Sequence, residues 1–302
     1  MMDRSGRTGH AEPARVFISI ALASLFCLIA WTACAGGRQK SGKQTSLQWA
    51  PPDVDGAIPS LVDTPPCLQS EALAYAGQRS TELVDQLQNF TARETIRYRE
   101  MDEFGISLDG ATSLFDYAVD FKPRSASLIV AETRQAVGGP SFLPEDAKDA
   151  GLPALALIFH PYYQGDYDFH CEGRSSWKEV PAWVIHFAQR KGRPSRTHSF
   201  RSPTATYPAA LMGRAWISAD SYQVLHLEAA LIKGIGMLNL KSYAISVDYA
   251  PIHFRSQDVV AWLPQAAVTY SEFVKHRDVV EHTFSDFLLT SVQSQTGPMK
   301  PN

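Results

Sequence analysis

The chain has 302 residues, with 28 Lys and Arg against 31 Asp and Glu, so its formal net charge is −3. With 20% charged and 45% hydrophobic residues, it is neither disordered in bulk nor a polytopic membrane protein. The lack of excess positive charge argues against a nucleic-acid partner. The length allows one large domain or two small ones.

The N-terminus has the pattern of an export signal. Arg4, Arg7 and Arg15 precede an uncharged apolar run over residues 16–31, and small residues follow it. A membrane-spanning helix needs roughly 20 apolar residues, so this run is short for a permanent span. A basic start, a short apolar core and small residues after it are typical of a secretory signal. We therefore expect residues 1–33 to be a signal peptide.

The end of this run suggests how the chain is processed. Thr32-Ala33-Cys34 resembles the lipobox of bacterial lipoproteins, in which cleavage precedes a cysteine that carries the lipid. The resemblance implies lipidation at Cys34 and an outer-membrane lipoprotein facing the periplasm. Two alternatives stay open: the A-x-A site ending at Ala35 would give a soluble periplasmic protein, and an uncleaved run would anchor the chain as a helix. All three alternatives place the folded part outside the cytoplasmic membrane.

A low-complexity stretch follows the lipobox. Residues 35–46 are rich in Gly, Lys, Gln and Ser, and residues 51–66 hold five prolines without hydrophobic periodicity. This composition is typical of a linker. We expect a lipid-anchored flexible linker over residues 34–66, a single folded domain over 67–292 and a disordered tail over 293–302.

The four cysteines separate into different roles. Cys27 lies in the signal, Cys34 is the lipidation candidate, and Cys67 and Cys171 remain as an even pair in an oxidising compartment. We therefore predict a disulfide between Cys67 and Cys171. The alternative is two separate buried thiols. No further Cys or His stands at ligand spacing beside either cysteine, so we predict no metal site.

Two segments have helical patterns. Apolar residues recur at helical spacing over residues 68–89, which predicts a long helix with one interior glycine, Gly77. Residues 143–163 contain an apolar stretch between Pro153 and Pro161. We interpret it as a short buried helix that Pro153 opens and Pro161 ends, with a core strand as the alternative.

In the rest of the chain, the hydrophobic pattern repeats every two residues. Apolar side chains alternate with polar ones around Ile96, Tyr117, Ile185, Leu227 and Ile245, which indicates half-buried antiparallel strands. We count about ten. A sheet of this size curls because its strands twist. The expected fold is mainly β, of the α+β class: a half-barrel with the long N-terminal helix and the short middle helix on its concave face.

A family resemblance rests on strand and turn patterns. Residues 213–228, from Gly213 through Trp216 and Asp220 to Glu228, resemble a strand–turn–strand unit of the outer-membrane lipoprotein carrier (LolA/LolB-like) superfamily. Residues 262–265 resemble its later Leu-Pro step, and residues 90–94 resemble its first strand. The resemblance implies a half-barrel that holds acyl chains, carries or inserts lipoproteins, or senses envelope stress.

Known catalytic signatures are missing from the sequence. It contains no G-x-S-x-G, H-E-x-x-H or P-loop motif, and the H-x-E of His170–Glu172 lacks the downstream P-C-x-x-C of zinc deaminases. We therefore expect no catalytic residues, no cofactor and no enzymatic activity. A hydrolase site assembled from distant residues is the remaining alternative.

Aromatic residues on alternating strand positions are the candidates for a ligand cavity. Most of them should be core, and some should line an apolar space in a half-barrel, where each buried CH₂ of a lipid contributes about 0.8 kcal/mol. The five candidates are Trp183, Phe187, Trp216, Tyr243 and Tyr249. The function we expect is non-catalytic binding of an acyl chain, lipid or lipoprotein by a membrane-anchored protein. The alternative is an envelope sensor or protein-interaction module on the same fold.

Overall fold

A computed structural model describes residues 48–56, 61, 67–124, 127–139, 149–202, 204–255 and 258–291. All of them belong to one compact unit, Ser46–Asn302. The expected signal peptide, Cys34 and the tail over 293–302 lie outside the described residues. Within the described ranges, no helix is both long and apolar enough to cross a bilayer.

The described chain is dominated by strands. Its helical elements are α1 (Gln69–Gln86), η2 (Leu155–Phe159), α2 (Pro161–Gln164) and η3 (Gly236–Leu238). Its strands are β1 (Asn89–Asp102), β2 (Ser107–Arg124), β3 (Ser127–Ala136), β4 (Asp149–Ala150), β5 (Tyr167–Trp177), β6 (Val180–Gln189), β7 (Ser199–Arg201), β8 (Thr206–Pro208), β9 (Leu211–Ser218), β10 (Val224–Leu231), β11 (Leu240–Phe254), β12 (Val259–Phe273) and β13 (His276–Ser291).

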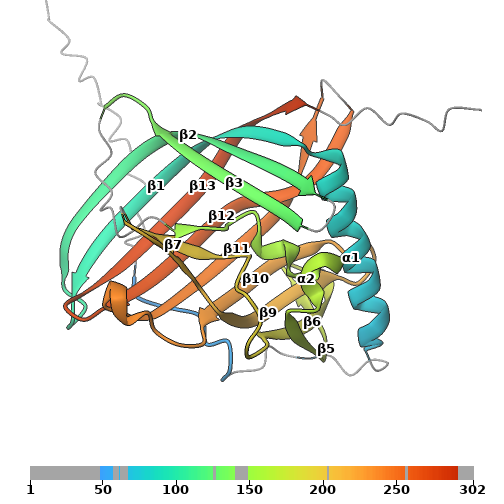
Figure 1. Ribbon diagram of the computed structural model, residues 1–302, viewed down its shortest axis with the longest axis horizontal. Helices are drawn as coiled ribbons and strands as arrows, with labels where there is room; N and C mark the ends of the chain where they lie inside the picture. The colour runs from blue at the N-terminus through green and yellow to red at the C-terminus, as the bar shows by residue number, and fades with distance from the viewer. Residues whose placement is uncertain are drawn as a thin grey trace, which may run out of the picture. The chain divides into compact units, whose positions relative to one another are not determined.

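The main sheet has ten strands in the order β3-β2-β1-β13-β12-β11-β10-β9-β6-β5, and β4, β7 and β8 form a second small sheet. All neighbouring pairs in the main sheet are antiparallel. Figure 1 shows the sheet curling around the short helices of the middle segment, with α1 along one side. The predicted half-barrel of about ten antiparallel strands is confirmed.

Helix α1 is three residues shorter at its C-terminal end than the sequence predicts. Leu87 adopts an extended conformation, and Asn89 already begins β1. The buried face of α1 is made of small side chains such as Ala72 and Ala76. A Cβ on Gly77 would lie 3.0 Å from the carbonyl oxygen of Phe159. The interior glycine therefore allows the helix to pack closely against η2.

The middle segment fills the concave face. Residues 152–159 are fully or almost fully buried, and they belong to the main hydrophobic core together with α1 and the strands. The predicted short buried helix is present as η2, which ends at Phe159, two residues before Pro161. It begins at Leu155 and not at Pro153, and Pro161 in addition opens α2. Proline suits a first helical position, where its missing N–H has no partner to lose. The ring nitrogen Nδ1 of His160 accepts a hydrogen bond from the Tyr162 amide and caps this turn.

The alternation of faces along β10 is interrupted at a bulge. Leu227 and Ala229 of β10 belong to the main core, as predicted. Leu225 instead packs with Val184 and Trp216 in a separate cluster. The pairing of β9 with β10 shifts register between Val224 and His226, and such a bulge re-aims the side chains before it.

The segment over residues 48–56 packs on the convex face of the sheet. Val54 is 4% exposed, and Arg214 donates a hydrogen bond to the carbonyl oxygen of Asp53 at 3.2 Å. The Trp49 ring contacts Tyr270 edge-on, with the ring centroids 5.8 Å apart. This part of the stretch expected to be linker is therefore in contact with the sheet, because its apolar side chains find partners there.

Candidate functional site: a groove along the first helix

A groove of about 300 Å³ runs between α1 and the neighbouring strand ends. Small-molecule sites in proteins usually measure about 300–1,000 Å³, so the groove lies at the lower end of that range. One wall comes from α1, and the other comes from the β9–β10 turn and the start of β12. The lining residues are Arg79, Glu82, Leu83, Gln86, Gln223, Val260, Ala261 and Trp262.

The groove extends inward beneath α1 as a smaller space of about 20 Å³. The two spaces share lining residues, including Leu83 and Trp262, so they lie next to each other. The inner part is lined mainly by apolar groups, among them Ala76, Ala156 and Val224. The lining therefore changes from mostly polar in the outer space, the mouth of the groove, to mostly apolar in the inner space.

The polar mouth is fixed by one guanidinium group. Arg79 contacts Glu82 at 2.7 Å through Nη1, and its Nε donates to the carbonyl oxygen of Ser221 at 2.9 Å. Gln78 donates a second hydrogen bond to Glu82. The hydrogen bond from Arg79 lowers the pKa of Glu82 below its ordinary value, so this carboxylate is ionised near neutral pH. The mouth thus presents a paired positive and negative charge.

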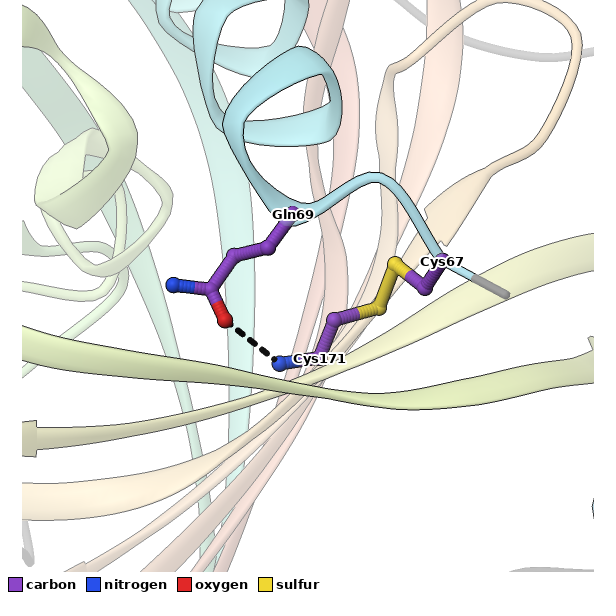
Figure 2. Close-up of a disulfide and its surroundings, with 3 residues drawn as sticks. All are labelled: Cys67, Gln69 and Cys171. Carbon is purple, nitrogen blue, oxygen red and sulfur yellow. Dashed lines mark hydrogen bonds between the residues drawn. A yellow bond between two sulfur atoms is a disulfide. The ribbon is translucent and has the colours of Figure 1, made fainter.

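A disulfide holds the N-terminal end of α1. Cys67 and Cys171 are joined, and the Cys171 amide donates to the Gln69 side-chain oxygen at 3.1 Å (Figure 2). The predicted disulfide is confirmed. Because Cys171 lies on β5, an edge strand of the main sheet, the bond ties the start of the helix to that edge.

Side-chain contacts hold the body of α1. Tyr75 and Tyr222 pack ring against ring with their centroids 4.7 Å apart, and the Tyr222 hydroxyl donates to Glu71 at 3.0 Å. On the inner side, the Gln164 amide donates to the carbonyl oxygens of Leu73 and Phe159. These contacts set the width of the groove, because α1 is one of its two walls.

Three of the five predicted cavity residues lie in the packed main core: Phe187, Tyr243 and Tyr249. Of these, Tyr249 lines the inner end of the groove. Burial raises the pKa of its hydroxyl well above the ordinary value, so it remains neutral. Tyr243 instead packs against His198 and Phe200, away from the groove.

The other two predicted residues are separated from this site. Trp216 belongs to the cluster with Val184 and Leu225, while its strand neighbours Ala215 and Ile217 belong to the main core. Successive strand residues point to opposite faces, so Trp216 lies on the convex face. Trp183 is half-buried, with the Arg174 guanidinium 5.7 Å from its ring centroid.

A buried ionic cluster is the main feature that the sequence analysis missed. Glu94 is fully buried and accepts hydrogen bonds from Arg134, at 2.6 and 3.1 Å, and from His282, at 2.8 Å. Glu132 accepts from the Tyr117 hydroxyl and the Gly151 amide. Burial by itself would raise the pKa of Glu94, but Arg134 and His282 hold it below its ordinary value.

A sequence signal for this cluster exists in β1. Glu94 stands two positions before Ile96 and four before Tyr98, so it has the parity of the apolar face. A carboxylate on a buried face requires a buried partner. The identity of that partner, Arg134 on β3, depends on a strand pairing that the sequence does not reveal.

The described residues bring no three His, Cys, Asp or Glu side chains together in a way that could hold a metal ion. The fold and site thus define a half-barrel whose concave face is packed and whose side, beneath a disulfide-tethered helix, carries an amphipathic groove.

Comparison with known proteins adds distant structural matches. No protein-family model and no curated protein matches the chain. A DUF1329 family protein from Desulfovibrio piger matches at 10% identity and TM-score 0.38, over 73% of this chain and 92% of its own. A LolA superfamily protein from Nitrosomonas europaea matches at 10% identity and TM-score 0.36, over 72% of this chain and 94% of its own. A putative outer membrane lipoprotein-sorting protein domain from Vibrio parahaemolyticus matches at 12% identity and TM-score 0.37, over 76% of this chain and 95% of its own.

Proposed function

We propose that this protein binds the hydrocarbon part of a lipid or lipoprotein in the groove along α1, without catalysing a reaction. The polar head of the ligand lies at the mouth beside Arg79 and Glu82, and its chain points inward past Leu83 toward Tyr249. Trp262 forms the opposite wall.

The observation that supports this proposal most is the polarity gradient of the groove. Charged side chains gather at the mouth, and apolar side chains line the inner end beneath the helix. An amphipathic molecule matches such a gradient, because each CH₂ that leaves water contributes about 0.8 kcal/mol while its head stays hydrated. The inner space is small, so we expect α1 to move outward when the ligand enters.

We further propose that the chain is anchored to the outer membrane through a lipid on Cys34 and faces the periplasm. Denaturing mass spectrometry of the mature protein should show a cysteine at its N-terminus carrying the mass of acyl chains. A mature chain that begins at Gly36 without lipid would contradict the anchor.

Native mass spectrometry of the full chain purified from cells tests the groove. We expect a non-covalent lipid adduct on the wild-type protein. Leu83→Glu places a charge in the apolar wall and should lower the adduct fraction about tenfold or more, because burying an unpaired carboxylate is costly.

Leu68→Glu is the matched control for this experiment. It adds the same charge to the start of the same helix, where Leu68 is exposed and lines neither part of the groove. This variant should keep its lipid. Equal adduct fractions in the two variants would place the lipid elsewhere and reject the groove as its site.

A second candidate function is a sensor or protein-interaction module. The packed concave face favours it, because residues 152–159 occupy the space that a half-barrel would otherwise offer to a ligand. A wild-type protein that reproducibly carries no lipid, yet retains a specific protein partner after cross-linking in cells, would support this function over lipid binding.

A further inference from the structure

Three neighbouring loops meet at one end of the main sheet. They are the β1–β2 turn (residues 103–106), the β12–β13 turn (274–275) and the segment with η3 before β11 (236–239). Asp102 pairs with His276, and the Val274 amide donates to the Asn239 carbonyl oxygen at 3.1 Å. Figure 1 shows these loops together at the left of the view, on the side away from α1.

These loops expose an unusual amount of apolar surface. Phe104 is 80% exposed and Met237 is 79% exposed, the two highest values among the large hydrophobic side chains of the described chain. We define the apolar rim as these exposed side chains of the three loops and of the adjoining start of β2: Phe104, Ile106, Leu108, Met237 and Val274. Large exposed apolar side chains that gather on neighbouring loops are typical of a surface that binds a partner.

The β1–β2 turn holds Phe104 outward by a defined structure. One carboxylate oxygen of Asp102 accepts hydrogen bonds from the amides of Phe104 and Ile106, at 2.9 and 2.8 Å. Gly105 has a φ of +82°, which suits a residue without a Cβ. The turn is therefore built to project an apolar side chain, even though exposure of Phe104 to water is unfavourable.

The charges beside the rim are mixed. Lys275 follows Val274 directly, and Lys241 is an exposed residue at the start of β11. Glu103 beside Phe104 and Asp109 beside Leu108 are exposed carboxylates. Lysine side chains can keep their ammonium groups at the lipid headgroups while their stems cover apolar surface. Apolar tips flanked by such lysines are typical of an interfacial membrane contact.

The path of the N-terminal chain supplies an independent argument. The described chain starts at Gln48, and the adjacent Trp49 contacts Tyr270 of β12 and lies under the guanidinium of Arg277 of β13. Both partners flank the β12–β13 turn. Gln48 follows Cys34 by 14 positions, so the chain between them spans at most about 50 Å when fully extended. A lipid on Cys34 would thus keep Gln48, which lies beside the β12–β13 turn, within about 50 Å of the bilayer surface.

We propose that the apolar rim rests in the headgroup layer of the bilayer to which the chain is anchored. The partner is a lipid surface, and the rim orients the half-barrel on it. This inference rests on the proposed membrane anchoring, and it does not depend on the groove, which lies at the other end of the strands.

Hydrogen exchange of the full chain in vesicles of phosphatidylethanolamine and phosphatidylglycerol tests the proposal. The double variant Phe104→Asp with Met237→Asp should lift the rim from the lipid. Amides at 274–275, which carry no substitution, should then exchange about tenfold faster than in the wild type, because they lose the cover of the bilayer.

The matched control is Leu68→Asp with Leu288→Asp. These side chains are 63% and 65% exposed and lie outside the rim, so exchange at 274–275 should not change. Leu83→Glu, which disrupts the groove, should also leave it unchanged, so that failure of the rim and failure of the groove are distinguished. Equal exchange at 274–275 in the wild type and the rim variant would overturn the proposal. Protection of 274–275 that depends on protein density in the vesicles would identify a second copy as the partner and would also overturn it.

Discussion

Glu94 and Arg134 form a salt bridge inside the half-barrel, where water has little access to either charged group. The carboxylate is fully buried, and the Arg134 side chain is 18% exposed. Breaking a buried pair from one side typically costs about 3–5 kcal/mol, because it leaves the other charge uncompensated. We therefore expect Arg134→Met to lower the free energy of unfolding by about that amount. Urea denaturation followed by circular dichroism measures it.

Arg97→Met provides the comparison for this residue. Arg97 pairs with Glu281 at 2.6 Å, but both side chains are about one-third exposed. Salt bridges between partly exposed side chains typically contribute at most about 1 kcal/mol. If Arg134→Met destabilised the protein no more than Arg97→Met, the ionic cluster would not contribute to stability as we describe.

His226 gives the protein a pH dependence of known sign. Its ring contacts Asp248 at 2.8 Å and stacks on Trp177 at 3.6 Å. Burial by itself would lower the pKa of His226, but the hydrogen bonds with Asp248 and Glu228 outweigh it and raise the pKa above 6.5. The folded state therefore binds this proton more tightly than the unfolded state. The resulting stability is fully present below about pH 6.5 and is lost as the pH rises through the raised value.

His160 is an internal contrast, because burial lowers its pKa. Its contribution is present above about pH 6.5 and is lost as the pH falls through the lowered value, which is the opposite sign. Thermal unfolding from pH 5.5 to 9 should show that His226→Gln flattens the decline on the alkaline side. A variant with an unchanged alkaline decline would contradict the role we assign to His226.

At the scale of elements, the disulfide is the main covalent constraint on α1. It closes a loop with a sequence separation of 104, for which the chain-entropy estimate is about 4.7 kcal/mol. We expect Cys67→Ser with Cys171→Ser to lower the free energy of unfolding by about 2–5 kcal/mol. Because the disulfide tethers the start of α1, the amide hydrogens of residues 69–86 should also exchange faster in this variant. Exchange in the interior of β12 should change less.

Two outcomes would argue against this view of α1. Unchanged exchange over residues 69–86 would mean that Tyr222 and Gln164 hold the helix without the disulfide. Loss of all protection would mean that the disulfide stabilises the whole unit and not the helix in particular.

The sequence predicted elements well where local periodicity decides them. The helix now seen over Gln69–Gln86 and the strands around Tyr117 and Ile245 follow from spacing alone. The prolines marked the middle helix only in part: η2 ends just before Pro161, as predicted, but it begins two residues after Pro153, and Pro161 also opens α2. Periodicity failed at Leu225 because a bulge depends on how β10 pairs with β9, and pairing is not a local property.

At the scale of the whole described unit, two features lie at opposite ends of the strands. The groove lies beside α1 and the start of β12, and the apolar rim lies at the β1–β2 and β12–β13 turns. If the rim rests on the bilayer as proposed, the groove lies at the end of the unit away from the membrane. The proposed ligand would then be held at a distance from the proposed anchor.

Much of the candidate site could not be predicted from the sequence. Alternation placed Tyr249 on the apolar face, and it lines the inner groove. The mouth instead combines Arg79 from a helix with Gln223 and Trp262 from the β9–β10 turn and from β12. These residues are far apart in the sequence and share no motif, so only the packing of α1 across the strand ends brings them together.

The most direct test of the account uses a fatty acid with a photoactivatable diazirine near the end of its chain. After irradiation of the full chain, peptide mapping should find the label on residues 76–83 of α1 and 260–262 of β12, and unlabelled palmitate should compete it away. Leu83→Glu should lose this label. Label found on the apolar rim or spread over the surface, with none in these two segments, would contradict binding of an acyl chain in the groove.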